Sequence, residues 1–149
     1  MVKFFLLFML VTGGYLFSAK AQTSTITVNI TNLKSDRGTC FICLYNKAAD
    51  FPRIANAAFT QSKLIRNGEA HFKIEAVKNG TYAIAAYHDE NGNGKFDENF
   101  LGIPKEGVGV SNNQLSSFGP PKFHDAKFEI NSGKNLELTI KMKYYTFPK

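Results

Sequence analysis

Short runs in which apolar and polar residues strictly alternate constrain the fold of this 149-residue chain more than any other feature. Residues 25–30 read Thr-Ile-Thr-Val-Asn-Ile, and the same alternation returns at residues 70–76 and 136–143. A period of two places the apolar side chains on one face of a β-strand. No segment shows the 3.6-residue period of an amphipathic helix of about ten residues. The sequence therefore predicts a fold built from half-buried strands.

Two further runs, residues 39–45 and 81–87, are apolar on both faces. Strands of this kind lie in the middle of a sheet, where both faces are covered. Together the runs predict an all-β domain of roughly six to seven strands, a small antiparallel β-sandwich of immunoglobulin-like or prealbumin-like type. The Asn-Gly pair at residues 79–80 predicts a hairpin turn between the strands at 70–76 and 81–87.

A long connection interrupts the alternation between residues 88 and 123. Residues 99–125 show no regular pattern, and a loop of this length inside a compact domain is usually either functional or disordered. Its Phe and Pro content argues against disorder. We therefore expect one long ordered connection that covers one end of the sandwich, with Phe118 or Phe123 partly buried. A short helix near residues 54–59 is also possible.

Residues 1–21 have the order of a secretory signal peptide. A positively charged residue precedes a mostly apolar run at residues 4–17, and small residues occupy the −3 and −1 positions of a cleavage site. The apolar run is shorter than the roughly 20 residues of a membrane-spanning helix, although an uncleaved anchor remains the alternative. We expect cleavage to leave a single β-sandwich domain, residues 22–149, that begins with Gln22.

The expected location is therefore the periplasm, the cell envelope or the medium. Without Lys3 and Lys20, the excess of Lys and Arg over Asp and Glu falls from +6 to +4. The basic residues are scattered, whereas a nucleic-acid-binding protein usually clusters them on one element. We expect no nucleic-acid partner, and after processing no segment is long and apolar enough to be an integral membrane segment.

The two cysteines, Cys40 and Cys43, lie in the strand predicted at residues 39–45. Positions three apart in a strand point to opposite faces, with Cα atoms roughly 10 Å apart, whereas a disulfide needs Cα atoms within about 7 Å. No second cysteine pair is present for a zinc site. The sequence predicts two buried or half-buried free thiols.

Residues 89–97 carry a pattern that points to a metal ion. They read Asp-Glu-Asn-Gly-Asn-Gly-Lys-Phe-Asp, with oxygen-bearing side chains at alternate positions and glycine at the sixth. In an EF-hand-like loop this spacing directs side-chain oxygens of positions 1, 3, 5 and 9 and the backbone carbonyl of position 7 toward one calcium ion. The predicted calcium ligands are Asp89, Asn91, Asn93, the carbonyl of Lys95, and Asp97.

The twelfth position of such a loop, where a bidentate Glu normally closes the shell, is Phe100 in this chain. Glu98, Asn99 or an oxygen from elsewhere would have to replace it. With two carboxylates in the motif, the expected affinity is weak, with a Kd of about 10⁻⁴ to 10⁻³ M. A plain turn without metal is the alternative, because Asn-Gly pairs are common in turns. Phe96 is expected to anchor the loop in the core.

The three histidines, His71, His88 and His124, show no metal-binding spacing, and no serine lies in a nucleophile elbow. The sequence therefore predicts no catalytic set and no enzymatic activity. A hydrolase of prealbumin-like architecture is the alternative. It would require the fold to bring His88, His124 and a carboxylate together around a cleft.

The second half of the chain resembles bacterial secreted proteins of the family named domain of unknown function 2141. The resemblance extends over the mature chain, and its specific part is residues 87–126. The motifs that carry it are His-Asp-Glu-Asn-Gly-Asn-Gly-Lys at 88–95, Asn-Phe-Leu-Gly-Ile-Pro-Lys-Glu-Gly at 99–107, Ser-Asn-Asn at 111–113 and Phe-Gly-Pro-Pro-Lys-Phe at 118–123. The resemblance implies a bacterial envelope or extracellular protein and no particular activity.

These observations favour an exported, non-enzymatic domain that is stabilised by calcium at residues 89–97. Its partner would be a protein or glycan ligand in the envelope, bound by an exposed surface on the long connection. The alternative is a purely structural accessory domain without metal. The apolar residues expected on this surface are Phe100, Ile103, Val108, Val110, Phe118 and Phe123.

Overall fold

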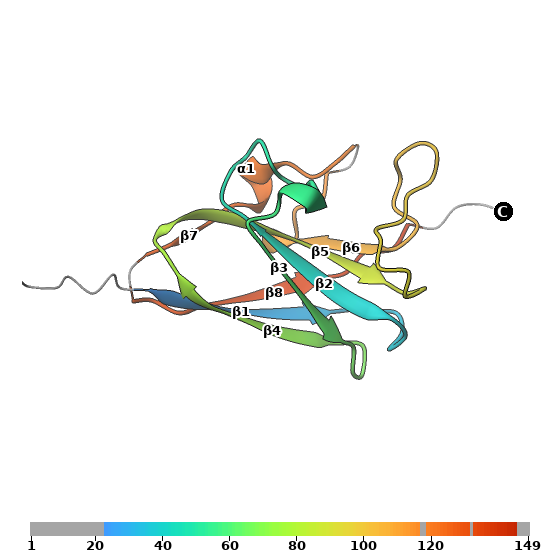
Figure 1. Ribbon diagram of the computed structural model, residues 1–149, viewed down its shortest axis with the longest axis horizontal. Coiled ribbons are helices and arrows are strands. Elements are labelled where there is room, and N and C mark those ends of the chain that lie inside the picture. Colours follow the sequence, from blue (N-terminus) through green and yellow to red (C-terminus); the bar gives the residue numbers. More distant parts are fainter. Residues whose placement is uncertain (1–22, 117–118, 132, 146–149) are drawn as a thin grey trace, which may run out of the picture.

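The structure is a computed structural model that describes residues 23–116, 119–131 and 133–145. It consists mainly of two β-sheets packed against each other (Figure 1). The predicted signal peptide, residues 1–21, and its cleavage site lie outside the described residues. No helix in the described part of the chain is long and apolar enough to cross a membrane.

The smaller sheet contains three strands in the order β4-β1-β8. They are β1 (Ser24–Thr31), β4 (Ala70–Val77) and β8 (Leu136–Lys141). The central strand, β1, alternates buried and half-buried residues along its whole length, as its sequence predicts. β1 is antiparallel to β4 but parallel to β8, so the expectation of an antiparallel sandwich fails at this one pair.

The larger sheet has the order β3-β2-β5-β6, with β7 also paired to β5. Its strands are β2 (Thr39–Tyr45), β3 (Phe59–Leu64), β5 (Gly80–Asp89), β6 (Gly107–Val110) and β7 (Phe128–Ile130). Within the described ranges, three short helices accompany the strands: η1 (Ile54–Asn56), η2 (Ser111–Asn113) and α1 (Phe123–Ala126).

The main core lies between the two sheets. It is formed by inward-facing apolar side chains of both sheets, and burial of this apolar surface is the principal stabilising contribution. Its most enclosed members include Ile26, Val28, Ile30, Ile42, Phe72, Ile84 and Ile140. The predicted all-β sandwich is therefore confirmed, and the described residues form eight strands in place of six or seven.

A second apolar cluster covers the outer face of the larger sheet. On β2, Cys43 and Tyr45 point into this cluster, while Ile42 points into the main core. On β5, Tyr87 points into the second cluster and Ile84 into the main core. This arrangement explains why the sequences of both strands are apolar on both faces.

The two thiols separate as the alternation of β2 predicts. Cys40 lies in the main core and Cys43 in the second cluster, and both are free and buried. Burial raises the pKa of the Cys40 thiol to about 12 and also raises the pKa of Cys43. Both groups remain protonated and unreactive at neutral pH.

The predicted hairpin at Asn79-Gly80 is wrong. β4 pairs with β1 in the smaller sheet, whereas β5 pairs with β2, β6 and β7 in the larger one. Residues 78–79 therefore carry the chain from one sheet to the other. An Asn-Gly pair permits a sharp change of direction but does not specify a pairing partner, because each strand pairs where its apolar faces become buried. The expected central position of β5 is confirmed.

The long connection contains more regular structure than its sequence predicts. β6, η2 and α1 all lie between residues 99 and 126. β6 joins the larger sheet beside β5, and Leu115, Phe123 and Ala126 pack in the second cluster on the outer face of that sheet. Phe123 is partly buried, as expected, and its ring lies 5.9 Å from that of Phe51. Val110 is buried, contrary to the expectation that it is exposed, and Phe118 lies outside the described residues.

The segment before β4 also differs from expectation. The helix considered near residues 54–59 is reduced to the single turn of η1, and residues 59–64 form the edge strand β3. β3 has only one neighbour, β2, and nearly all of its residues are exposed. An edge strand of this kind buries no regular face, so its sequence carries no alternation.

Candidate functional site

The loop that follows β5 is organised by the buried carboxylate of Asp89, which is only 2% exposed. Its Oδ1 accepts hydrogen bonds from the backbone N–H groups of Gly92 and Asn93, at 2.8 and 3.1 Å. Its Oδ2 accepts a third from Gly94 at 2.8 Å. A carboxylate that accepts several backbone N–H bonds fixes the path of the chain around it. Asp89 therefore holds the loop in a closed turn.

Three other predicted ligands converge on the outer side of this turn. The side-chain nitrogens of Asn91 and Asn93 each donate a hydrogen bond to Oδ2 of Asp97, both at 2.8 Å. These bonds, first from Asn91 and then from Asn93, lower the pKa of Asp97 below its ordinary value. The loop thus brings together the side chains at its third, fifth and ninth positions, as the spacing predicts.

The backbone between these positions is fixed by two further bonds. Oδ1 of Asn91 accepts from the N–H of Asn93 at 3.0 Å, and Oδ1 of Asn93 accepts from the N–H of Lys95 at 2.8 Å. The second bond holds the residue whose carbonyl is a predicted ligand. Phe96 is half-buried, and its ring lies 5.6 Å from that of Tyr87. The aromatic anchor predicted for the loop is therefore present.

The loop does not stand in a metal-coordinating arrangement. In the described part of the chain, no group of three His, Cys, Asp or Glu side chains is placed to hold a metal ion. The amide groups of Asn91 and Asn93 turn nitrogen, not oxygen, toward Asp97. A cation would require both amides to rotate by about 180°, a change that exchanges atoms of nearly equal size.

None of the residues considered for the twelfth position supplies an available inward oxygen. Phe100 is 94% exposed at the tip of a loop. Glu98 is exposed. Oδ1 of Asn99 accepts hydrogen bonds from the N–H groups of Leu101 and Ile103, both at 2.9 Å. The closing oxygen of a calcium shell would therefore have to come from another part of the chain.

Glu106 is the residue that sequence reasoning missed. It precedes β6 and is only 6% exposed, and its Oε2 accepts a hydrogen bond from the N–H of Asp97 at 3.2 Å. Burial raises the pKa of its carboxyl, the N–H of Asp97 opposes this rise, and the carboxylates of Asp89 and Asp97 add to it. One signal was available, because Glu106 is the only acidic residue between Glu98 and Asp125.

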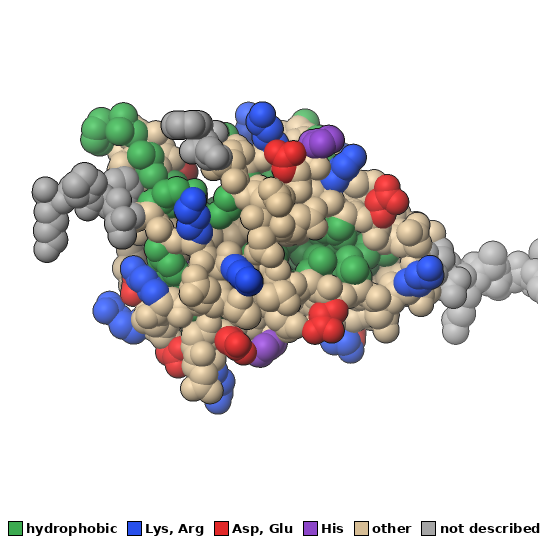
Figure 2. All heavy atoms as spheres, turned by 180° about the vertical axis from the view of Figure 1, so that it is seen from behind, with side chains coloured by type: hydrophobic (Ala, Val, Ile, Leu, Met, Phe, Trp, Pro, Cys, Tyr) green, Lys and Arg blue, Asp and Glu red, His purple; other side chains and the backbone are tan. Residues whose placement is uncertain are grey.

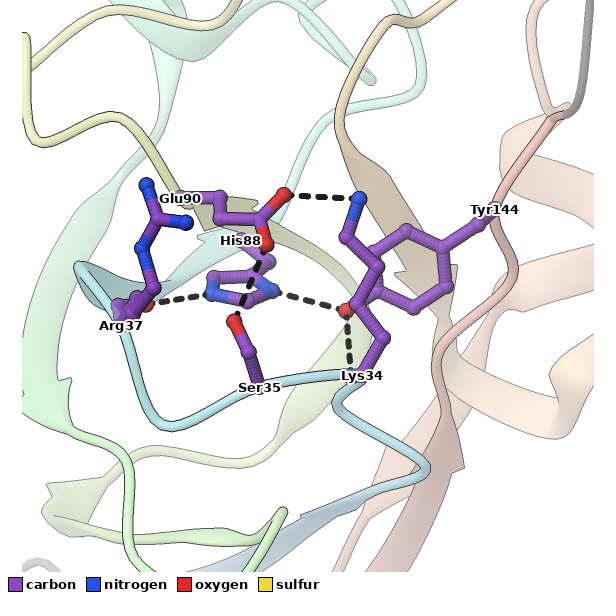
Figure 3. Close-up of polar contacts among 6 residues, drawn as sticks. All are labelled: Lys34, Ser35, Arg37, His88, Glu90 and Tyr144. Carbon is purple, nitrogen blue, oxygen red and sulfur yellow. Dashed lines mark hydrogen bonds and ion pairs between the residues drawn. The ribbon is translucent and has the colours of Figure 1, made fainter.

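His88, the residue before the loop, is completely buried and has partners on both ring nitrogens (Figure 3). Nε2 lies 2.7 Å from the carbonyl oxygen of Arg37, and Nδ1 lies 2.7 Å from the hydroxyl oxygen of Tyr144. Because a carbonyl only accepts, Nε2 carries the proton. The hydroxyl of Tyr144 also accepts from the N–H of Lys34 at 3.1 Å.

Glu90 ties the same segment to the loop (Figure 3). Its carboxylate lies 2.7 Å from Nζ of Lys34 and accepts a hydrogen bond from the hydroxyl of Ser35 at 3.0 Å. Together with the bond from His88 to Arg37, these contacts hold residues 34–37 against the start of the 89–97 loop. His88 therefore has a structural arrangement with no side-chain nitrogen left to act on a substrate.

The set required by the hydrolase alternative is not assembled among the described residues. His124 is exposed on α1, and its Nδ1 lies 3.0 Å from the carboxylate of Asp125. His88 and His124 share no partner. The third histidine, His71, lies on β4 with Asn29 and Glu69 beside it.

An apolar pocket of about 580 Å³ lies over the outer face of the larger sheet. Figure 2 shows apolar side chains gathered on this side, beneath a projecting tip. Phe100 and Leu101, in the turn between Asn99 and Ile103, are 94% and 66% exposed. The pocket volume falls within the range of small-molecule sites, about 300–1,000 Å³. Its lining includes Ala85, Tyr87, Phe96, Ile103, Val110 and Leu115.

Comparison with known proteins gives one match. The sequence model of a family described as an uncharacterized protein conserved in bacteria, DUF2141, matches residues 28–139. This span includes six complete strands, β2 to β7, together with the 89–97 loop and Glu106. No curated protein and no solved structure matches the chain.

Proposed function

The chain belongs to the bacterial family DUF2141, and on this premise we propose that it is an exported, non-enzymatic domain stabilised by calcium at residues 89–97. Its role is to bind a ligand in the cell envelope or outside the cell, or to support a larger assembly there. The predicted signal peptide provides the route of export, and calcium at millimolar concentration is available to extracellular modules with weak sites.

The observation that carries the calcium proposal is the convergence of Asn91, Asn93 and Asp97 around one point. Two side-chain amides lie 2.8 Å from the same carboxylate oxygen, a spacing close to that of neighbouring oxygens around a calcium ion with ligands at about 2.3–2.6 Å. Asp89 has three N–H bonds on its two oxygens. A carboxylate offers about four acceptor positions, so one remains for a cation.

The binding role is supported by the surface beside this loop. An apolar pocket and an exposed apolar tip at Phe100 and Leu101 lie close together on the long connection. Exposed apolar groups rimmed by polar residues commonly mark interaction sites. We propose that a protein or glycan ligand of the envelope contacts this surface. A structural accessory domain without metal remains the competing function.

Calcium binding is tested by titration calorimetry of the purified domain, residues 22–149. We expect one site with a Kd no weaker than about 10⁻³ M. Magnesium should bind more weakly, because it requires a tighter octahedral shell and releases its water reluctantly. The absence of any saturable calcium signal at millimolar concentration would leave the metal-free structural domain as the better account.

Export is tested by intact-mass analysis of the protein recovered from the periplasm or the medium of a bacterial host. We expect a mass that corresponds to a chain beginning at Gln22. The physical basis is the short apolar run followed by small residues at the cleavage site. Full-length protein in the membrane fraction would support the uncleaved anchor instead.

A further inference from the structure

We infer that Glu106, which lies outside the 89–97 motif, supplies the carboxylate that closes the calcium shell. This inference rests on the proposed calcium site and adds a ligand that the motif lacks. It replaces the bidentate Glu that an EF-hand loop carries at its twelfth position. The sequence places Phe100 there, and its side chain is 94% exposed.

The first support is an unpartnered oxygen. Oε1 of Glu106 is buried and accepts no hydrogen bond, while the residue as a whole is 6% exposed. The N–H of Glu90 lowers the pKa of this carboxyl, but it forms no hydrogen bond with Oε1. Buried carboxylate oxygens are normally hydrogen-bonded, ion-paired or bound to a metal. Oε1 is therefore available as a ligand for a cation.

The second support is the position at which this carboxylate is held. Oε2 of the same carboxylate accepts from the N–H of Asp97, so the carboxylate lies beside the ninth position of the loop. Glu106, Asn91 and Asp97 line one small pocket of about 230 Å³. One oxygen is fixed by the backbone of a proposed ligand, and the residue as a whole lines the pocket that Asn91 and Asp97 also line.

The third support is the repulsion between Glu106 and two carboxylates of the loop. The carboxylates of Asp89 and Asp97 both act unfavourably on a charged Glu106. Arg37 and Lys105 line the same pocket, yet among the described residues neither forms an ion pair with Glu106. Carboxylates that are charged at the same time repel one another. A divalent cation bound by Asp97 and Glu106 would offset this repulsion.

The closing ligand also links the metal to the apolar pocket. Asp97 and Glu106 stand at the two ends of a short hairpin, which is closed by a hydrogen bond from the N–H of Lys105 to the carbonyl of Asp97 at 2.9 Å. Leu101 and Ile103 of this hairpin line the apolar pocket. A calcium ion held by both ends would fix this wall, so calcium should slow hydrogen exchange across residues 98–105.

The test compares the calcium affinity of three forms of the 22–149 domain by titration calorimetry: wild type, Glu106→Gln and Glu98→Gln. Gln keeps the size of Glu106 and its acceptor for the N–H of Asp97 but removes the charge. We expect Glu106→Gln to weaken calcium binding at least about tenfold, because ligand charge sets affinity in such loops. Glu98→Gln, which changes an exposed carboxylate close to the same loop, should bind like wild type.

Each outcome bears on a different claim. If wild type binds calcium and Glu106→Gln binds equally well, the inference about Glu106 is wrong while the calcium site stands. Loss of affinity in Glu98→Gln alone would assign the closing role to Glu98 and overturn the inference. If wild type binds no calcium, the proposed site itself fails. Thermal unfolding in chelator checks that Glu106→Gln is folded. Because this substitution removes an unpaired buried charge, we expect its melting temperature to be no lower than that of wild type.

Discussion

Replacement of Asp89 by alanine is expected to lower the melting temperature by on the order of 10 °C even in the presence of chelator. The buried carboxylate accepts N–H bonds from Gly92, Asn93 and Gly94. Hydrogen bonds to a charged group contribute about 1.5–3 kcal/mol each. Part of this loss is recovered because the released N–H groups can form hydrogen bonds with water. A net loss of about 3–5 kcal/mol is therefore expected. Thermal unfolding followed by circular dichroism measures it.

Asp97→Ala is the matched control in the same loop. Its carboxylate accepts bonds only from the exposed side chains of Asn91 and Asn93 and not from the buried backbone. In chelator we expect a decrease of less than about 1 kcal/mol. Equal destabilisation by Asp89→Ala and Asp97→Ala would show that the three backbone bonds of Asp89 do not determine the stability of the loop.

Gly38→Ala is expected to destabilise the fold by more than about 3 kcal/mol, or to prevent folding. Gly38 has a φ of +73°, and a Cβ built on it would lie 1.9 Å from the carbonyl oxygen of Asp89. The atoms that this Cβ would meet belong to the backbone of Asp89 and Glu90, so they cannot rotate away. The close approach is what allows residues 34–37 to contact His88 and Glu90. Chemical denaturation compared with wild type measures the loss.

Gly102→Ala is the matched control that separates the cost of a positive φ from the cost of steric overlap. Gly102 has nearly the same φ, +72°, but a Cβ there would meet nothing within 4 Å. It carries only the conformational cost of a left-handed residue, about 1–2 kcal/mol. If Gly38→Ala were no more destabilising than Gly102→Ala, the contact between residue 38 and Asp89 would have no role in holding the loop.

Most of the fold follows from local patterns in the sequence. Alternation identifies β1, β4 and β8, and two-sided apolar runs identify the central strands β2 and β5. In each case the pattern of apolar positions shows whether one or both faces of the strand are buried. The opposite faces of Cys40 and Cys43 follow from the same rule. The edge strand β3 and the short strand β6 were missed. β3 buries no regular face, and β6 alternates glycine with valine over only four residues.

Strand pairing could not be predicted from the sequence. The Asn79-Gly80 turn suggested a hairpin, yet β4 and β5 belong to different sheets. Pairing depends on which faces are covered after collapse, and that is decided by contacts distant in sequence. The parallel pair of β1 and β8 arises in the same way, since it joins the first and last strands of the fold.

In the candidate site, contacts between residues close in sequence could be predicted, whereas a contact between distant residues could not. The convergence of Asn91, Asn93 and Asp97 follows from spacing within nine residues, and the structure brings these side chains together. The spacing predicts Asp89 as a calcium ligand, and its three hydrogen bonds from backbone N–H groups were not predicted. Glu106 could not be assigned, because it reaches the loop through the return of a hairpin and not through sequence spacing.

The measurement that tests the central claim most directly is thermal unfolding of the 22–149 domain in chelator, in millimolar calcium and in millimolar magnesium. At a calcium concentration ten times Kd, binding to the folded state alone stabilises it by about 1.4 kcal/mol, or a rise of a few degrees in Tm. Magnesium should give a smaller rise, and Asp97→Ala should lose the calcium response while it keeps its melting temperature in chelator close to that of wild type. Identical wild-type curves in chelator and in calcium would contradict the account and identify residues 89–97 as a plain turn.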